Sequence, residues 1–335
     1  MHGNRLLAAA KLVKFADTAK CLRMKIWLPR DYYLILHPEM SRKYAATIGF
    51  FDGVHQGHQC LVQQLRQWAG HLGLGSMVVT FDRHPRQVLH ADYVPALLST
   101  LDEKVELLRL TGVDEVRVLH FTPDMAALDA LHFMREVLAA RLNVGALLMG
   151  YDHRFGHGGG TPDQYVAWGR QVGMPVTLAT EWTGGKVSSS VVRRLLQEGD
   201  VTEAARLLGR SYSLTGVVTG GHRVGHRLGY PTANLSLPAG KLVPACGAYA
   251  VRCILPGGAR HGGMLCIGHR PTLHNGNDVS VEVNVFDFSG DLYNKEMSVD
   301  LVAHLRPERA FPSLEALREQ LARDEAQARN ILGGV

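Results

Sequence analysis

Cysteines and long apolar runs are scarce in this 335-residue chain, and each scarcity argues against a class of protein. The five cysteines are odd in number and show no CxxC spacing, so the sequence predicts neither a zinc ribbon nor a disulfide framework. No apolar run approaches the roughly 20 residues that a membrane helix requires, so we expect no membrane-spanning segment. The composition is that of a soluble globular protein, and a reducing cytoplasm is the expected location.

An excess of one charge is lacking as well. A net charge of +5 and a pI near 9.0 are mild for this length and suit anionic small ligands such as nucleotides. A nucleic-acid binder would more often gather its basic residues into a stripe or tail, so we expect no nucleic-acid partner. The chain has no internal repeat or low-complexity tract, and its length favours two domains.

Residues 1–23 differ in composition from the rest of the chain. They carry five basic residues against the single acidic Asp17, among alanines and leucines. An organellar presequence has this composition, and an upstream extension is the alternative that we favour. Met24 begins the stretch that leads into the first predicted strand, so we expect residues 1–23 to lie outside the fold.

The stretch TIGFFDGVHQGH at 47–58 predicts a strand, a glycine turn and then a helix. Gly49, Gly53 and Gly57 allow the backbone to come close to a ligand. A helix that starts near Gly57 would point its free N–H groups and positive dipole end at that ligand. The stretch is therefore a candidate phosphate site.

His55 and His58 lie at this turn and can donate hydrogen bonds to phosphate oxygens as negative charge develops. Two alternatives stay open on spacing alone. The pair can be a metal site, although i, i+3 ligands need a third partner, or it can be two surface histidines without a role.

Alternating strands and helices follow in the first half of the chain. The expected strands are Met77–Phe81, Val116–Phe121, Ala146–Met149 and Val176–Ala179, and the expected helices are Leu101–Thr111 and Ala126–Leu142. This alternation predicts a Rossmann-like parallel sheet, which binds ligands at the carboxyl ends of its strands.

From Ser211 onward the pattern has period two, with glycine turns in place of helices. The expected strands are Tyr212–Thr219, Ala248–Ile254, Met264–Ile267, Val279–Phe288 and Met297–Leu305, followed by a single long helix over 313–332. Short strands with glycine-rich turns predict a small antiparallel β-barrel with a C-terminal helix.

The string GFFDGVHQGH at 49–58 resembles the nucleotidyltransferase signature of the bacterial bifunctional riboflavin kinase/FMN adenylyltransferases, also called FAD synthetases. The resemblance implies nucleotide-binding roles for Gly49, Phe51, Asp52 and Gly57, and charge-stabilising catalytic roles for His55, His58 and Arg193.

Three further strings extend the resemblance through the first half. TFDRHP at 80–85 is similar to a loop near the phosphates and flavin, and it implies flavin-binding Asp82 and His84, with Arg83 where the family usually has proline. GYDHRFG at 150–156 implies nucleotide-binding Gly150, Asp152 and Arg154 and flavin-binding Phe155. SSSVVR at 188–193 implies phosphate-binding Ser188, Ser189 and Ser190, although serines that open a helix are ordinarily N-caps.

The second half carries a glycine-rich string at 220–234 that ends in GYPTAN and resembles the riboflavin kinase pattern. It implies nucleotide-binding Gly220, Gly225, Gly229 and Thr232, and magnesium ligands Thr232 and Asn234; His226 stands where the family commonly has arginine. The resemblance also implies that Glu282 is the catalytic base and that Arg306 and Arg323 bind flavin. Without it, a plain surface turn and an exposed cross-strand glutamate are the expected alternatives.

The resemblance implies a bifunctional enzyme with an α/β adenylyltransferase domain at 24–205 and a barrel kinase domain at 211–335. Riboflavin and ATP would give FMN, and FMN and ATP would give FAD and pyrophosphate, with Mg²⁺ as cofactor. Two alternatives remain: a nucleotidyltransferase for another substrate, and a flavin-binding regulator without catalysis. We expect a monomer or a weak oligomer.

Overall fold

The computed structural model describes residues 42–89, 96–150, 153–220, 229–269 and 279–333. The expected extension at 1–23 lies outside these residues. The described chain divides into two compact units. The first holds the described parts of Met1–Phe50, Val62–Ala91 and Gly112–Thr180, and the second holds Phe51–Leu61, Asp92–Thr111 and Glu181–Val335. Among the described residues, no helix is long and apolar enough to cross a membrane.

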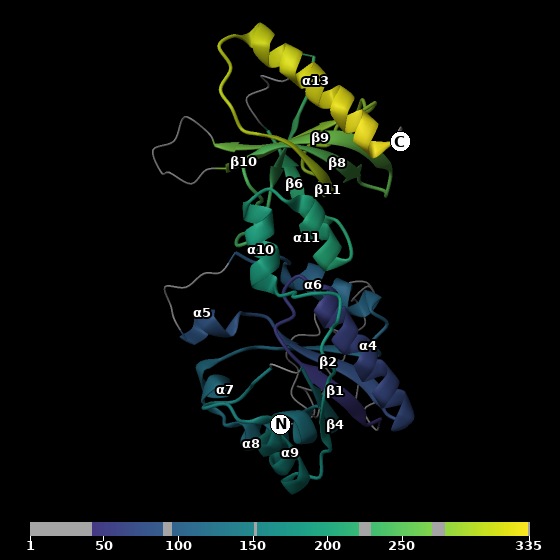
Figure 1. Ribbon diagram of the computed structural model, residues 1–335, viewed down its shortest axis with the longest axis vertical. Helices are drawn as coiled ribbons and strands as arrows, with labels where there is room; N and C mark the ends of the chain where they lie inside the picture. The colour runs from purple at the N-terminus through teal and green to yellow at the C-terminus, as the bar shows by residue number, and fades with distance from the viewer. Residues whose placement is uncertain (1–41, 90–95, 151–152, 221–228, 270–278, 334–335) are drawn as a thin grey trace, which may run out of the picture. The chain divides into compact units, whose positions relative to one another are not determined.

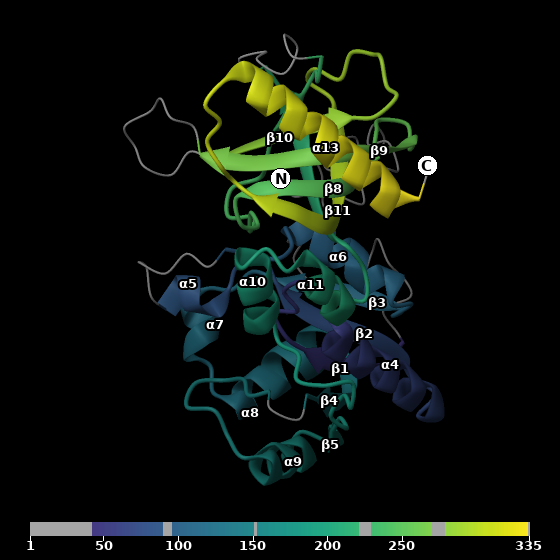
Figure 2. The same ribbon diagram turned by 45° about the horizontal axis from the view of Figure 1, so that its top comes forward.

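A parallel sheet forms the centre of the first unit, as the sequence predicts, with the strand order β3-β2-β1-β4-β5 (Figure 1; Figure 2 labels all five strands). Its strands are β1 (Tyr44–Ile48), β2 (Gly75–Phe81), β3 (Glu115–Leu119), β4 (Val144–Met149) and β5 (Val176–Leu178). All neighbouring pairs run parallel. Every residue of β2 is buried, which is typical of a strand covered on both faces.

Helices connect these strands. They are α4 (Gln56–His71), α5 (Pro85–Leu89), α7 (Pro123–Ala127), α8 (Ala130–His132), the π-helix η2 (Phe133–Arg141) and α9 (Pro162–Gln171). Helix α4 begins where the glycine turn predicts a helix start, and it buries Val62, Leu65 and Ala69 on one face. Its first residues, up to Leu61, belong to the second unit.

The single helix expected over Ala126–Leu142 is wrong, because the chain breaks at Leu128. Leu128 is extended, and the Asp129 side chain accepts a hydrogen bond from the His132 amide and so starts a new helix. The freed Leu128 carbonyl accepts a hydrogen bond of 2.8 Å from the His157 amide. A distant loop therefore takes over one of the backbone groups that a continuous helix would have used.

The second unit contains a closed antiparallel barrel with the strand order β10-β7-β6-β11-β8-β9. Its strands are β6 (Tyr212–Thr219), β7 (Ala233–Ser236), β8 (Gly247–Ile254), β9 (Arg260–His269), β10 (Val279–Val285) and β11 (Glu296–Pro307). This confirms the predicted barrel, and it adds β7, which the period-two pattern did not indicate. Alternating residues such as Val281 and Val283 point into the barrel core, so Glu282 and Asn284 project outward.

Three short helices belong to the same unit: α6 (Leu101–Leu110), α10 (Ser189–Gln197) and α11 (Val201–Leu208). Thr100 is the N-cap of α6, in a capping box with Glu103. Leu196 of α10 and Leu208 of α11 lie in one apolar cluster with the interior barrel residues. The barrel core therefore continues into these helices.

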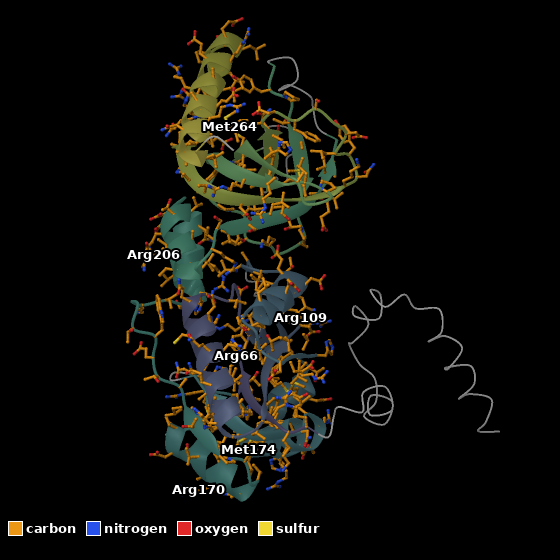
Figure 3. The ribbon with its side chains drawn as sticks, turned by 90° about the vertical axis from the view of Figure 1, so that its right-hand side faces the viewer. Arg66, Arg109, Arg170, Met174, Arg206 and Met264 are labelled. Carbon is orange, nitrogen blue, oxygen red and sulfur yellow. The ribbon has the colours of Figure 1, made fainter. Side chains whose placement is uncertain are left out.

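Helix α13 (Leu314–Leu332) lies along the outer face of the barrel beside β8 and β9 (Figures 1 and 2). Ala328 and Leu332 pack with Met264, which Figure 3 labels on the barrel next to the helix. The Arg306 guanidinium donates to the Asp324 carboxylate at 2.9 Å, and Asp324 is only 2% exposed. A buried ion pair thus fastens the helix to β11.

We predict that Asp324→Ala lowers the free energy of unfolding by about 3–5 kcal/mol, because it leaves the Arg306 charge buried without its partner. Glu319→Ala is the matched control, since Glu319 lies on the same helix, is exposed and contacts Arg323 only at 3.8 Å. It should change stability by less than about 0.5 kcal/mol. Denaturant unfolding of both variants checks this, and equal losses would contradict it.

Candidate functional sites

The turn that follows Phe50 is strained. Phe51 and Val54 have φ angles of 55° and 40°, which are uncommon for residues with side chains, and Gly53 has φ 76°. Partners from elsewhere in the second unit hold this backbone. The Gly53 amide donates to Ser99 Oγ at 3.0 Å, and Arg210 donates to the Gly53 carbonyl at 2.7 Å. Strain that is maintained by surrounding contacts is a frequent property of functional turns.

This turn brings His55 and His58 into a stack. Their ring centroids are 3.6 Å apart with an interplanar angle of 18°, and His55 is 6% exposed. The His58 amide donates to His55 Nδ1 at 3.4 Å, which leaves the proton of a neutral His55 ring on Nε2.

The absence of a side chain at Gly57 leaves space for the stacked His55 and His58 rings. A Cβ at this position would lie 3.0 Å from Val187 Cγ1 and 3.3 Å from the His55 ring. Both contacts are tighter than ordinary van der Waals contact, so a side chain here would displace the imidazole.

Asp52 is a buried carboxylate, 3% exposed, that accepts hydrogen bonds from protein groups. The amides of Leu98 and Ser99 each donate to it at 3.1 Å, and Arg193 Nη2 donates at 2.6 Å. The sequence predicts nucleotide binding by Asp52, and in the structure its oxygens hold Arg193. Sequence reasoning missed Ser99, which no motif marks.

Arg193 lies on α10 and is held at two points. Besides the Asp52 contact, its Nε donates to the Ala96 carbonyl at 2.9 Å. Ser188 is the N-cap of this helix, with its side chain accepting from the Val191 amide, as the ordinary interpretation of the serines predicts. Ser189 Oγ donates to the Asp52 carbonyl at 2.9 Å, and Ser190 is exposed.

In the first unit, Asp82 and His84 follow β2 at its carboxyl end, where a parallel sheet binds ligands. Asp82 contacts His120 Nδ1 at 2.5 Å and accepts from the Phe121 amide at 3.1 Å. The His84 ring meets Phe50 edge-on, with centroids 4.7 Å apart. His120 was not predicted as a site residue, because the sequence placed it inside the expected strand Val116–Phe121, whereas β3 ends at Leu119.

Gly150 follows the carboxyl end of β4, and Phe155, from the described residues after 152, is held by Tyr165. The Tyr165 hydroxyl donates to the Phe155 carbonyl at 2.6 Å, and the two rings are 4.8 Å apart. Arg154 is exposed beside it, and the predicted Asp152 lies outside the described residues.

The barrel presents a polar cluster on its outer face. Thr232 Oγ1 donates to Glu282 Oε2 at 3.1 Å, and Asn284 donates to the Pro231 carbonyl at 2.8 Å. Asn234 is directly opposite Glu282 in the β7–β10 pair, which puts the two side chains on one face. Thr232, Asn234 and Glu282, which the sequence singled out, therefore lie together on the outer barrel face.

A cavity of about 280 Å³ opens beside this cluster, between the outer barrel face and α13. Its walls combine polar and apolar side chains, namely Tyr230, Thr232, Met264, Cys266, Glu282, Asn284, Arg306, Glu308, Arg309, Phe311, Leu317, Leu321 and Asp324, with Gly247, Ala248 and Leu265. Burial raises the pKa of the Cys266 thiol to about 11, so this wall residue is uncharged at neutral pH.

Of the remaining predicted residues, some lie near this cavity and others do not. Gly229, with φ 84°, lines a second hollow of about 360 Å³ with Tyr230 and Arg329. Gly220 is exposed directly after β6, and Gly225 and His226 lie outside the described residues. The Arg323 side chain is 65% exposed, pairs with Glu319 and does not line the cavity as Arg306 does.

Two family models match this chain, one in each half. The FAD synthetase family model matches residues 37–191, and the riboflavin kinase family model matches residues 208–332. The bifunctional riboflavin kinase/FMN adenylyltransferase of Listeria monocytogenes is 35% identical over 286 residues, which cover 84% of this chain and 90% of that protein. The chain belongs to the bifunctional riboflavin kinase/FMN adenylyltransferase family.

Other relatives of this chain carry the same family description. That of Escherichia coli K12 is 36% identical, covering 86% of this chain and 92% of the relative, and that of Pseudomonas fluorescens is 38% identical, covering 88% and 94%. A crystal structure described as a macrolide-efflux protein from Streptococcus pneumoniae has a TM-score of 0.77 at 30% identity, covering 86% of this chain and 94% of that one. The similarity to this bifunctional family thus includes both units of the chain.

We predict that Gly57→Ala lowers FAD formation from FMN by about tenfold or more, because the added methyl group displaces the His55 ring. Riboflavin phosphorylation should keep its rate. Gly70→Ala is the matched control on the same helix, where a Cβ meets nothing within 4 Å. It should raise stability by about 0.4–1 kcal/mol and leave both reactions unchanged. Wild-type FAD formation in Gly57→Ala would contradict the prediction.

Proposed function

We propose that this chain makes FAD from riboflavin in two successive reactions that each consume ATP. The first is riboflavin kinase activity, which gives FMN and ADP, and the second is FMN adenylyltransferase activity, which gives FAD and pyrophosphate. Membership of the bifunctional family supports both activities. The observation that carries the assignment is the contact of Thr232 with Glu282 on a cavity wall of the barrel.

Glu282 is the proposed base of the kinase reaction. It accepts the proton of the riboflavin 5′-hydroxyl while that oxygen bonds to the γ-phosphorus of ATP and the bond from that phosphorus to the ADP oxygen breaks. The 3.1 Å hydrogen bond from Thr232 holds one carboxylate oxygen and so orients the other toward a substrate. Arg306 and the apolar wall with Met264 and Leu317 are suited to a flavin ring in the cavity.

Thr232 and Asn234 are the proposed ligands of Mg²⁺. A hydroxyl oxygen and an amide oxygen are the hard ligands that Mg²⁺ prefers, and both residues share the outer barrel face with Glu282. When bound there with ATP, the ion neutralises phosphate charge. Gly220, Gly225 and Gly229 are proposed to bring backbone close to the nucleotide.

The adenylyl transfer reaction needs stabilisation of charge. An oxygen of the FMN phosphate bonds to the α-phosphorus of ATP, and the bond to the departing pyrophosphate breaks, without a protein nucleophile. His55, His58 and Arg193 are proposed to donate hydrogen bonds to the phosphate oxygens as negative charge develops. The α4 dipole adds to this, since His55 and His58 lie at the start of that helix.

The other predicted residues keep their proposed roles. Nucleotide binding is proposed for Gly49, Phe51, Asp52, Gly57, Gly150, Asp152, Arg154, Ser188, Ser189, Ser190 and Thr232, and flavin binding for Asp82, His84, Phe155, Arg306 and Arg323. We place the adenylyltransferase domain at 24–205 and the kinase domain at 211–335, in a cytoplasmic enzyme that is a monomer or weak oligomer without a nucleic-acid partner.

Chromatography of flavins tests the two assignments separately. With riboflavin, ATP and Mg²⁺, the wild-type protein should form FMN and then FAD. Glu282→Gln should form FMN about 10²–10⁴-fold more slowly, because it removes the base, yet convert added FMN to FAD at the wild-type rate. Glu296→Gln, an exposed glutamate on β11, is the control and should change neither step.

His58→Ala should accumulate FMN, because loss of one charge-stabilising donor slows FAD formation by about 10²–10³-fold. His71→Ala, an exposed histidine at the other end of α4, is its control. Chelation of Mg²⁺ should stop both reactions. If the wild-type protein binds flavin but forms neither FMN nor FAD, it is a regulator. If it transfers adenylate to another acceptor and not to FMN, it is a nucleotidyltransferase for a different substrate.

A further inference from the structure

Three side chains with metal-binding atoms meet at the end of the barrel, beside the cavity described above, which Glu308 also lines. Cys246, His269 and Glu308 each offer one ligand atom, and these atoms all lie within 4.8 Å of one another. Cys246 Sγ is 3.5 Å from His269 Nδ1, and His269 Nδ1 is 3.2 Å from Glu308 Oε2. The three residues are far apart in sequence and show no motif spacing.

The barrel topology explains why they meet. Strand β8 lies between β11 and β9, and Gly247, at its start, is paired with Pro307 of β11 and Ile267 of β9. Cys246 immediately precedes β8, Glu308 immediately follows β11 and His269 ends β9. The adjacent ends of β8, β9 and β11 therefore each position one ligand.

Two of the three spacings between the ligand atoms fit a tetrahedral ion. With Zn–S near 2.3 Å, Zn–N near 2.05 Å and Zn–O near 2.0 Å, tetrahedral angles place sulfur and nitrogen about 3.5 Å apart and nitrogen and oxygen about 3.3 Å apart. The corresponding distances of 3.5 and 3.2 Å match these edges. The third pair, Cys246 Sγ and the Glu308 oxygen, lies within 4.8 Å against a tetrahedral edge of about 3.5 Å, so the ion requires an adjustment of these side chains.

The surroundings also fix the carboxylate. The His269 amide donates to Glu308 Oε1 at 3.2 Å, which leaves Oε2 turned to the other ligands. A Cβ on Gly268 would lie 2.5 Å from Glu308 Oε1, so the absence of a side chain there makes room for the carboxylate. Outer contacts of this kind orient metal ligands.

We propose that Cys246, His269 and Glu308 form a binding site for a divalent transition metal ion, with Zn²⁺ as the expected occupant and water as the fourth ligand. A thiolate and an imidazole favour Zn²⁺ over Mg²⁺, which prefers oxygen ligands alone. On binding, the Cys246 thiol loses its proton to solvent and the sulfur bonds to the ion.

The site adjoins the proposed kinase cavity, because Glu308 and Gly247 also line that cavity. An ion on Glu308 would hold this wall in place and remove its negative charge. We therefore expect Zn²⁺ to change riboflavin phosphorylation. This consequence rests on the proposed kinase function, whereas metal binding does not.

Titration of the metal-free full chain with Co²⁺, in excess Mg²⁺ and without nucleotide, tests the site. The wild-type protein should bind one Co²⁺ with a thiolate-to-cobalt charge-transfer band, and Zn²⁺ should remove the band stoichiometrically. Cys246→Ser should abolish the band, and Glu308→Gln should weaken binding about tenfold or more, as even loss of an outer contact does. Cys60→Ser and His132→Ala, which alter a thiol and a histidine elsewhere, should bind as the wild type does.

A wild-type protein without the band, or a band that survives Cys246→Ser, would overturn the site. A band lost in Cys266→Ser but kept in Cys246→Ser would also overturn it, since that thiol is on the cavity wall. Equal thermal unfolding of the metal-free variants excludes misfolding as the cause of a loss. If Zn²⁺ changes the rate of riboflavin phosphorylation in the wild type but not in Cys246→Ser, the expected effect of the site on the kinase reaction is supported. An equal change in both proteins overturns this effect and leaves the metal site itself standing.

Discussion

The arrangement of the second unit depends on the hydrogen bonds that the buried carboxylate of Asp52 accepts. It joins the strained turn after Phe50, the amides of Leu98 and Ser99, and Arg193 of α10. A charged hydrogen bond contributes about 1.5–3 kcal/mol, and a buried carboxylate without donors would cost more than that. The three segments are therefore coupled, because displacement of any one removes a hydrogen-bond donor from the buried carboxylate.

This coupling also explains how an unfavourable backbone persists. Val54 has a positive φ that its branched side chain resists, at a cost of about 1–3 kcal/mol. The hydrogen bonds of Gly53 with Ser99 and Arg210 offset that cost. The strain is used to stack His55 on His58 at the start of α4, where both the dipole and the imidazoles favour an anion.

The barrel places its chemistry differently, through the alternation of side chains along a strand. Val281 and Val283 fill the interior, which forces Glu282 and Asn284 outward, and α13 then covers part of that outer face. Helix and barrel together make a cavity from a surface that would otherwise be open. The Arg306–Asp324 pair belongs to both the packing and the cavity wall, so stability and binding are linked there.

The sequence by itself determined the parallel sheet, the barrel and the starts of four helices, α4, α6, α10 and α13, because periodicity, glycine turns and caps such as Ser188 are local signals. It also indicated the glycine turn at 47–58, and the GYPTAN string marked Thr232, which meets Glu282. Local patterns could not show the break at Leu128, which depends on the His157 amide, or the short strand β7. Only the tertiary structure decided that Asp52 faces inward to Arg193, that Arg323 stays exposed while Arg306 lines the cavity, and that Cys246, His269 and Glu308 meet. Each of these depends on contacts between residues far apart in the chain, which the packing of strands and helices fixes and local sequence does not encode.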